Sequence, residues 1–126
     1  MRWTRPWWTS LAALSGFVAV AAGAFAAHGM QDPTAKELLR TGSLYELAHA
    51  LAVLACAALA GAGMPRARLA PAWFLGGSLL FSGSLYALAL GAPHIVGLVT
   101  PFGGVAFLIG WAVLAWAAAT SAQAGA

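Results

Sequence analysis

The sequence predicts an all-α membrane protein: a four transmembrane helix bundle with a short interfacial outer helix between the first and second spans. Two observations predict this class. Hydrophobic residues make up 62% of the chain and charged residues only 7%, whereas soluble domains carry about 25% charged residues. Four segments also have the ~20 mostly apolar residues that a helix needs to cross a bilayer. The length of 126 residues fits a single domain, which we place over residues 1–126.

The four predicted spans cover residues 9–27, 43–62, 70–90 and 101–119. We expect helices there because backbone polar groups in lipid have to form hydrogen bonds within the chain. The first span also has features of a signal peptide, including Ala24-Phe25-Ala26, which resembles a cleavage site. Its near-full membrane length and the preceding Trp7 and Trp8 favour a retained helix.

Asp32-Pro33 is typical of a helix start, because Asp caps free backbone N–H groups and proline suits the first helical position. We therefore expect a short interfacial helix over residues 33–41. Gly42 is expected to break it from the second span. Lys36 and Arg40 share one face of this helix at i and i+4.

The basic residues predict the orientation, since lysine and arginine are enriched in cytoplasmic segments. Four lie before the first span and in the second loop (Arg2, Arg5, Arg66 and Arg68), and two lie in the first loop (Lys36 and Arg40). Both termini and the loop over residues 64–69 are therefore expected in the cytoplasm. Tryptophans near the same predicted interface agree with this orientation: Trp3, Trp7, Trp8, Trp73 and Trp116. Trp111 lies in the middle of a span and does not fit this belt.

Small residues recur at about four-residue spacing in every span, as helices that approach closely in lipid require. They are Ala19, Gly23 and Ala27; Ala48, Ala52, Cys56 and Ala60; Gly83, Ala87 and Gly91; and Ala106 and Gly110, while Gly103-Gly104 after Thr100-Pro101 is typical of a closely packed helix start. The pattern favours a tight internal bundle. Some of these faces could instead dock another subunit.

Glu46 and His49 form the most informative polar pair, because i and i+3 positions share one helix face. An ionisable group inside a membrane is by default a candidate functional site. His49 is expected about two turns deep and Glu46 about one turn from the interface. His28 ends the first span, and His94 lies in the third loop on the same side.

Three interpretations of this pair remain open. In a structural one, His49 donates to a backbone carbonyl or to His28, and Glu46 reaches the headgroups or pairs with Arg40. In a second, Glu46 and His49 form a proton or ion relay with His49 as acceptor. In a third, His28 and His49 bind a metal or haem, with Glu46, Met30 or His94 as further ligands. No zinc-type ligand spacing supports that third interpretation.

Other function classes lack their signatures. The single Cys56 excludes an internal disulfide, and we expect it to be buried. No phosphate loop, dinucleotide fingerprint or nucleophile elbow is present. Ser78, Ser82 and Ser84 have no base nearby in the sequence, and the scattered basic residues do not predict nucleic-acid binding. We expect no enzyme and no cofactor. The expected partners are the lipid bilayer and a membrane-protein partner or a second copy of the chain.

Several motifs resemble a known family. They are Gly23-Ala24-Phe25-Ala26-Ala27-His28-Gly29, Tyr45 with His49-Ala50-Leu51-Ala52, Leu80-Phe81-Ser82-Gly83-Ser84-Leu85-Tyr86-Ala87-Leu88-Ala89, Thr100-Pro101-Phe102-Gly103-Gly104 and Gly110-Trp111. Over most of the chain they resemble the YgdD-like small bacterial inner-membrane proteins of unknown function, which are similar to the eukaryotic transmembrane protein 256 family. The resemblance implies four membrane helices and a plasma-membrane location, and it supplies no activity.

The resemblance also implies which positions matter. His28, Tyr45, His49, Ser82, Ser84, Tyr86, Thr100 and Trp111 lie on the family motifs. Glu46 and Ala26 depart from them, because the family more often has a neutral polar residue and glycine there. The first functional hypothesis is therefore a small scaffold or accessory protein that binds a larger membrane complex or lipid. The alternatives are a transporter or ion-conducting bundle that uses His49 and Glu46, with Tyr45 or Tyr86 tuning His49, and a metal or haem site.

Overall fold

The computed structural model describes residues 5–124 and contains four long helices and two short 3-10 helices in that range. They are α1 (Arg5–His28), α2 (Pro33–Gly61), η1 (Pro65–Leu69), α3 (Pro71–Ala89), η2 (His94–Leu98) and α4 (Thr100–Ala124). All four long helices are long and apolar enough to cross a membrane. The predicted fold class is thus confirmed. Arg2 and Trp3 are two of the residues that predict the orientation, and both lie outside the described residues.

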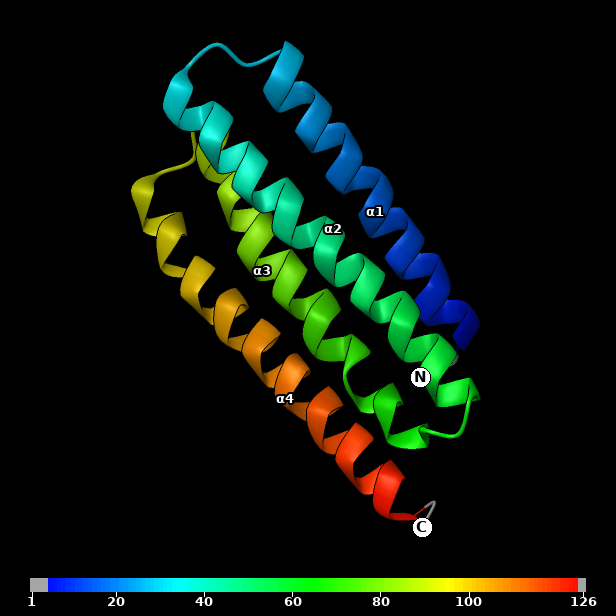
Figure 1. Cartoon of the computed structure of the whole chain (residues 1–126). Helices are drawn as coiled ribbons and strands as arrows, with labels where there is room; N and C mark the ends of the chain where they lie inside the picture. The colour runs from blue at the N-terminus through cyan, green and yellow to red at the C-terminus, as the bar shows by residue number, and fades with distance from the viewer. Residues whose placement is uncertain (1–4, 125–126) are drawn as a thin grey trace.

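Each long helix packs mainly against its neighbour in the chain. α1 packs on α2, α2 on α3 and α3 on α4, while α1 touches α3 only slightly. Figure 1 shows α1 and α4 on opposite sides of the α2–α3 pair, with both chain ends at the same end of the bundle. Large apolar side chains on the two outer helices are left exposed, such as Phe17 at 75% and Leu108 at 70%. In a bilayer these faces contact lipid.

The separate outer helix expected over residues 33–41 is not confirmed. The same residues form the first turns of α2, which continues without a break to Gly61. The start is as predicted: Asp32 accepts a hydrogen bond from the Ala35 N–H at 2.8 Å, and Pro33 follows it.

Gly42 does not interrupt α2. Its role is to allow close packing against α3, not to break the helix. A Cβ at Gly42 would lie only 2.6 Å from the Tyr86 ring. The Gly42 carbonyl also accepts a hydrogen bond from the Ser82 hydroxyl at 2.7 Å. Glycine at this position therefore lets α3 approach the backbone of α2.

The apolar core lies in the half of the bundle that holds the termini. Trp8 is 2% exposed and packs there with Ala12, Val53, Cys56 and Phe74. This corrects the expectation that Trp8 anchors the chain at the interface. Trp7 is 55% exposed, so for this residue the interfacial position stays a prediction. The two neighbours differ because one helix position between them turns the side chain by about 100°.

The glycines predicted to pack fall into two groups. A Cβ at Gly23 would lie 2.9 Å from the Ser43 hydroxyl, a Cβ at Gly110 would lie 2.6 Å from the Phe74 ring, and a Cβ at Gly103 would overlap the backbone of Phe81. By contrast, a Cβ at Gly83 would have no neighbour within 4 Å, and one at Gly104 would meet only Phe81, at 3.9 Å. Close packing inside the bundle thus explains the glycines at 23, 103 and 110. It does not explain those at 83 and 104.

Candidate functional site

Glu46 of α2 forms hydrogen bonds to side chains of both α1 and α3. Its side chain lies on α2 and is only 8% exposed. One carboxylate oxygen accepts a hydrogen bond from the Tyr86 hydroxyl of α3 at 2.7 Å, and the other accepts one from the Ser15 hydroxyl of α1 at 2.8 Å. Arg40 is exposed and does not pair with Glu46. Glu46 therefore neither reaches the headgroups nor forms the ion pair that was one of the expectations.

Glu46 lies farther from the start of its helix than the sequence suggested. Its partner Ser15 is thirteen residues from His28 and eight from Trp7 on α1, which corresponds to about 20 Å and 12 Å of helix. The expected depth of one turn assumed that the helix begins at residue 43, whereas α2 begins at Pro33. A charge at the membrane centre costs at least ~2.5–3.5 kcal/mol. The two hydroxyl donors supply polar contacts that reduce this cost.

His49 uses both ring nitrogens in hydrogen bonds. Nδ1 lies 2.7 Å from the Tyr45 carbonyl oxygen, and Nε2 lies 3.0 Å from the indole Nε1 of Trp111. A carbonyl can only accept and an indole N–H can only donate. The bonds therefore require a neutral imidazole that donates from Nδ1 and accepts at Nε2.

Aromatic rings surround the His49 imidazole. The Phe107 ring stacks on it with a centroid distance of 3.6 Å, and the Phe74 ring lies tilted at 5.5 Å. The Tyr45 ring lies beside this pair, with its centroid 6.2 Å from both the imidazole and the Phe107 ring. This enclosure and the bond from Trp111 explain why that tryptophan lies in mid-helix instead of at the interface. They also leave His49 without a free lone pair for a proton or a metal ion.

The buried hydroxyl groups bond to backbone or to neighbouring side chains. Ser82 bonds the Gly42 carbonyl, and Ser84 bonds the Phe81 carbonyl and the Thr100 hydroxyl. Ser43 donates to the Ala19 carbonyl at 2.6 Å. These bonds link α1 to α2, α2 to α3, and α3 to α4. Ser82, Ser84 and Thr100 thus act as contacts between helices, as serine and threonine commonly do in membranes.

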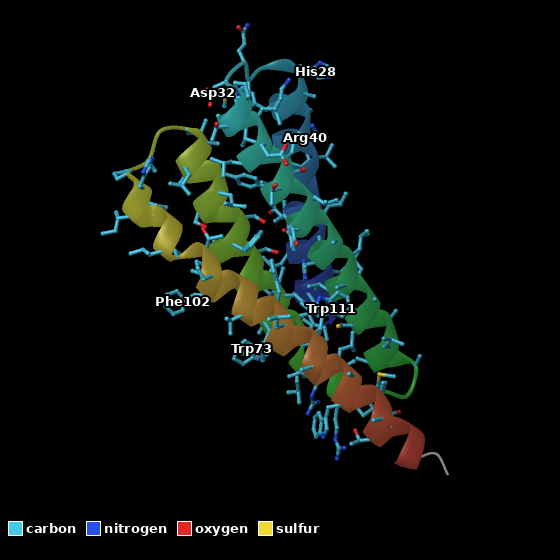
Figure 2. All side chains as sticks on the ribbon, turned by 60° about the vertical axis from the view of Figure 1, so that its left-hand side comes forward. His28, Asp32, Arg40, Trp73, Phe102 and Trp111 are labelled. Atoms are coloured by element: carbon cyan, nitrogen blue, oxygen red, sulfur yellow. The ribbon has the colours of Figure 1, made fainter. Side chains whose placement is uncertain are left out.

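The structure does not bring His28 to His49. His28 is exposed at the end of α1, and Figure 2 shows it near Asp32 and Arg40, far along the bundle from Trp111, the partner of His49. His94 is exposed in η2. Within residues 5–124 no group of three or more His, Cys, Asp or Glu side chains could hold a metal ion. The metal or haem interpretation gains no support from this geometry.

Sequence reasoning missed three members of the site: Ser15, Phe74 and Phe107. Ser15 is one of few polar residues in the otherwise apolar α1, which was an available signal. Its partner depends on the register between α1 and α2, which no spacing within either helix determines. The two phenylalanines lie in apolar spans where aromatic residues are common, so the sequence offered no signal for them.

Comparisons with known proteins place the chain among membrane proteins. Residues 22–104 match a family described as "Protein of unknown function (DUF423)". A "UPF0382 membrane protein" of Haemophilus influenzae is 49% identical over 110 residues, covering 85% of this chain and 89% of that protein. The "UPF0382 inner membrane protein YgdD" of Escherichia coli K12 is 42% identical over 113 residues, 82% of each chain. A Staphylococcus epidermidis "UPF0382 membrane protein" is 38% identical over 107 residues, 82% of this chain and 88% of that protein. No solved structure matches.

Proposed function

Because the chain belongs to the DUF423 family of membrane proteins of unknown function, we propose that it is a small accessory or scaffold protein of the bacterial inner membrane. In this role it binds another transmembrane helix of a larger membrane complex through one face of α3, the face that carries Gly76, Leu80 and Gly83. The proposal assigns the protein neither catalysis nor a cofactor. The arrangement of glycines on α3 is the observation that carries it.

Gly76 and Gly83 lie on one face of α3, since seven residues make almost two full turns. A Cβ at either position would have no neighbour within 4 Å. A glycine disfavours a helix by about 1 kcal/mol relative to alanine, and internal packing does not offset that cost here. Leu80 lies between them on the same face and is 38% exposed. Open glycines on a membrane helix are typical of a surface that another helix approaches closely.

The polar interior supports binding at the surface rather than transport through the centre. Both oxygens of Glu46 and both ring nitrogens of His49 have partners inside the chain. Among the described residues, Trp8 alone has a fully buried side-chain nitrogen or oxygen atom without a hydrogen-bond partner.

Site-specific photocrosslinking in native membranes tests the proposal. A benzophenone amino acid at Leu80 should crosslink to one protein, and the crosslink should be lost in a Gly76→Ile or Gly83→Ile variant. The same probe at Phe17, which is 75% exposed on α1, is the matched control and should give no such product. Crosslinks of equal yield at both positions, or none at Leu80, would overturn the proposed face. A crosslink to a second copy of this chain would show that the partner at this face is the chain itself, and the proposal of a larger complex would give way to a homo-oligomer.

The orientation is part of the same proposal, with both termini in the cytoplasm. It is supported by the position of both chain ends at one end of the bundle (Figure 1) and by Arg66 and Arg68 in η1 at that end. Fusions of a cytoplasm-active and a periplasm-active reporter to the C-terminus test it. Activity of the periplasmic reporter would reverse the orientation.

A second candidate function is proton or ion movement, which the burial of Glu46 within a predicted membrane span favours. Its test is flux into vesicles that contain the purified protein. A flux that Glu46→Gln abolishes would favour transport over the scaffold. Equal passive permeability of vesicles with and without protein would remove this candidate.

A further inference from the structure

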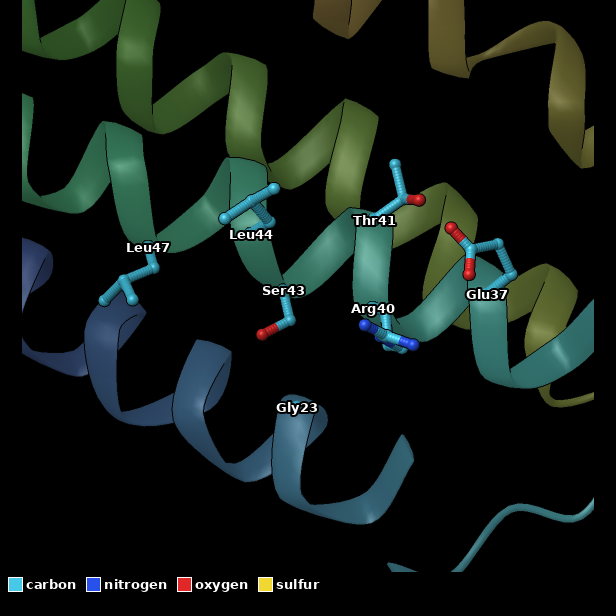
Figure 3. Close-up of a pocket in the computed structure, with 7 residues that line it drawn as sticks. All are labelled: Gly23, Glu37, Arg40, Thr41, Ser43, Leu44 and Leu47. Atoms are coloured by element: carbon cyan, nitrogen blue, oxygen red, sulfur yellow. The ribbon is translucent and has the colours of Figure 1, made fainter. Parts of the chain in front are cut away.

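A groove between the first half of α2 and α1 has the chemistry of a phospholipid site. Its volume is about 370 Å³, within the ~300–1,000 Å³ typical of ligand pockets. Gly23 of α1 forms one wall, and the other residues that line it come from α2. Figure 3 shows Arg40, Ser43 and Leu47 on the side of α2 that faces Gly23. The groove is distinct from the α3 face that carries the proposed function and does not depend on it.

Two opposite charges line the groove at its end nearest the start of α2. Arg40 and Glu37 are both exposed, and within the described residues neither has a hydrogen bond or an ion pair. A guanidinium binds phosphate with two parallel hydrogen bonds, and a carboxylate binds an ammonium group. Phosphate next to ammonium is the arrangement in a phosphoethanolamine headgroup.

An apolar stripe continues from Arg40 along α2. Leu44, Leu47 and Leu51 follow it at intervals of four, three and four residues, so all four side chains lie on one helix face. The leucines are exposed by 67%, 37% and 57%. From Arg40 to Leu51 the helix rises by about 16 Å, close to half of the ~30 Å hydrocarbon thickness of a bilayer. The stripe thus matches one acyl chain within one leaflet.

We propose that this groove binds one phospholipid with a phosphoethanolamine headgroup, its phosphate on Arg40, its ammonium at Glu37 and an acyl chain along Leu44, Leu47 and Leu51. The lipid is a component of the surrounding leaflet. Arg40 supplies affinity for the phosphate that all phospholipids share. Glu37 supplies the preference for a headgroup with an ammonium over an anionic one, because it repels a second negative charge.

Native mass spectrometry of the full chain in detergent tests the site. Phosphatidylethanolamine and phosphatidylglycerol with identical acyl chains are added in turn. We expect one bound phosphatidylethanolamine per chain, and Arg40→Gln should weaken its binding about tenfold, the loss typical of one contact to a charged group. Lys36→Gln is the matched control: it removes the same charge one turn away, outside the groove lining, and should leave binding unchanged. Glu37→Gln should remove the preference over phosphatidylglycerol.

Equal lipid binding by the wild type and Arg40→Gln would overturn the site. Equal weakening by Arg40→Gln and Lys36→Gln would also overturn it, because the effect would then reflect net charge. A wild-type preference for phosphatidylglycerol would overturn the headgroup assignment. A Leu47→Trp variant keeps both charges and fills the groove, and its loss of the bound lipid would support the site independently of Arg40. The readout is the mass of a lipid, so failure here is distinguishable from failure of the protein crosslinks at α3.

Discussion

Replacing Gly103 by alanine tests whether the close approach of α3 and α4 stabilises the bundle. Gly103 is buried on α4, and a Cβ there would overlap the backbone nitrogen of Phe81. Because a backbone atom cannot move aside as a flexible side chain can, the two helices have to separate. Overpacking of this kind costs typically about 1–3 kcal/mol. The helix preference of alanine offsets about 1 kcal/mol, which leaves a net expected loss of up to about 2 kcal/mol.

Gly104→Ala is the matched control, because it adds the same methyl group to the next residue of the same helix. Its Cβ would meet only the Phe81 ring, at 3.9 Å, so we expect stability unchanged or raised by up to about 1 kcal/mol. Both variants are unfolded with SDS in mixed micelles, and the free energy of unfolding is measured from tryptophan fluorescence. A Gly103→Ala protein as stable as Gly104→Ala would refute the close approach as a source of stability.

Three further predictions concern buried polar groups. Trp111→Phe removes the indole donor to His49 and should lower the unfolding free energy by about 1–2 kcal/mol. It should also shift the Nε2 signal of His49 in nitrogen NMR, and an unchanged signal would contradict the hydrogen bond. Tyr86→Phe should cost about 1–2 kcal/mol, and less when Glu46→Gln is already present; equal losses in both backgrounds would show that the two groups are not coupled. Cys56 is 0% exposed, so a membrane-permeant maleimide should label it only after unfolding, and labelling of the folded protein would contradict its burial.

The fold was predictable from the sequence because membrane insertion depends on length and hydropathy within each segment. Each predicted span overlaps one of the four long helices. The structure extends α4 to Ala124 instead of ending it at residue 119, and starts α2 at Pro33 instead of 43. The error at α2 arose at Gly42. A glycine in a sequence signals either a break or a close contact, and only the position of Tyr86 and Ser82 on α3 distinguishes them.

The same ambiguity applied to the other small residues. Gly103 and Gly104 are adjacent, and nothing in the sequence distinguishes their roles. Only Gly103 faces the Phe81 backbone. Gly77 was not singled out, and its Cβ would lie 2.6 Å from the Phe107 ring. A helix presents its residues about 100° apart, so one rotation of α3 or α4 decides which glycines pack.

The sequence by itself determined that this chain crosses a membrane four times, that a helix begins after Asp32, and that Glu46 and His49 share one helix face, because these properties depend on neighbours along one helix. Only the tertiary structure decided their partners: Ser15 and Tyr86 for Glu46, and Trp111 for His49. The two partners of Glu46 come from different helices, and Trp111 comes from α4. Which atoms meet depends on the rotation and register of each helix against the next, and no single segment encodes that relation.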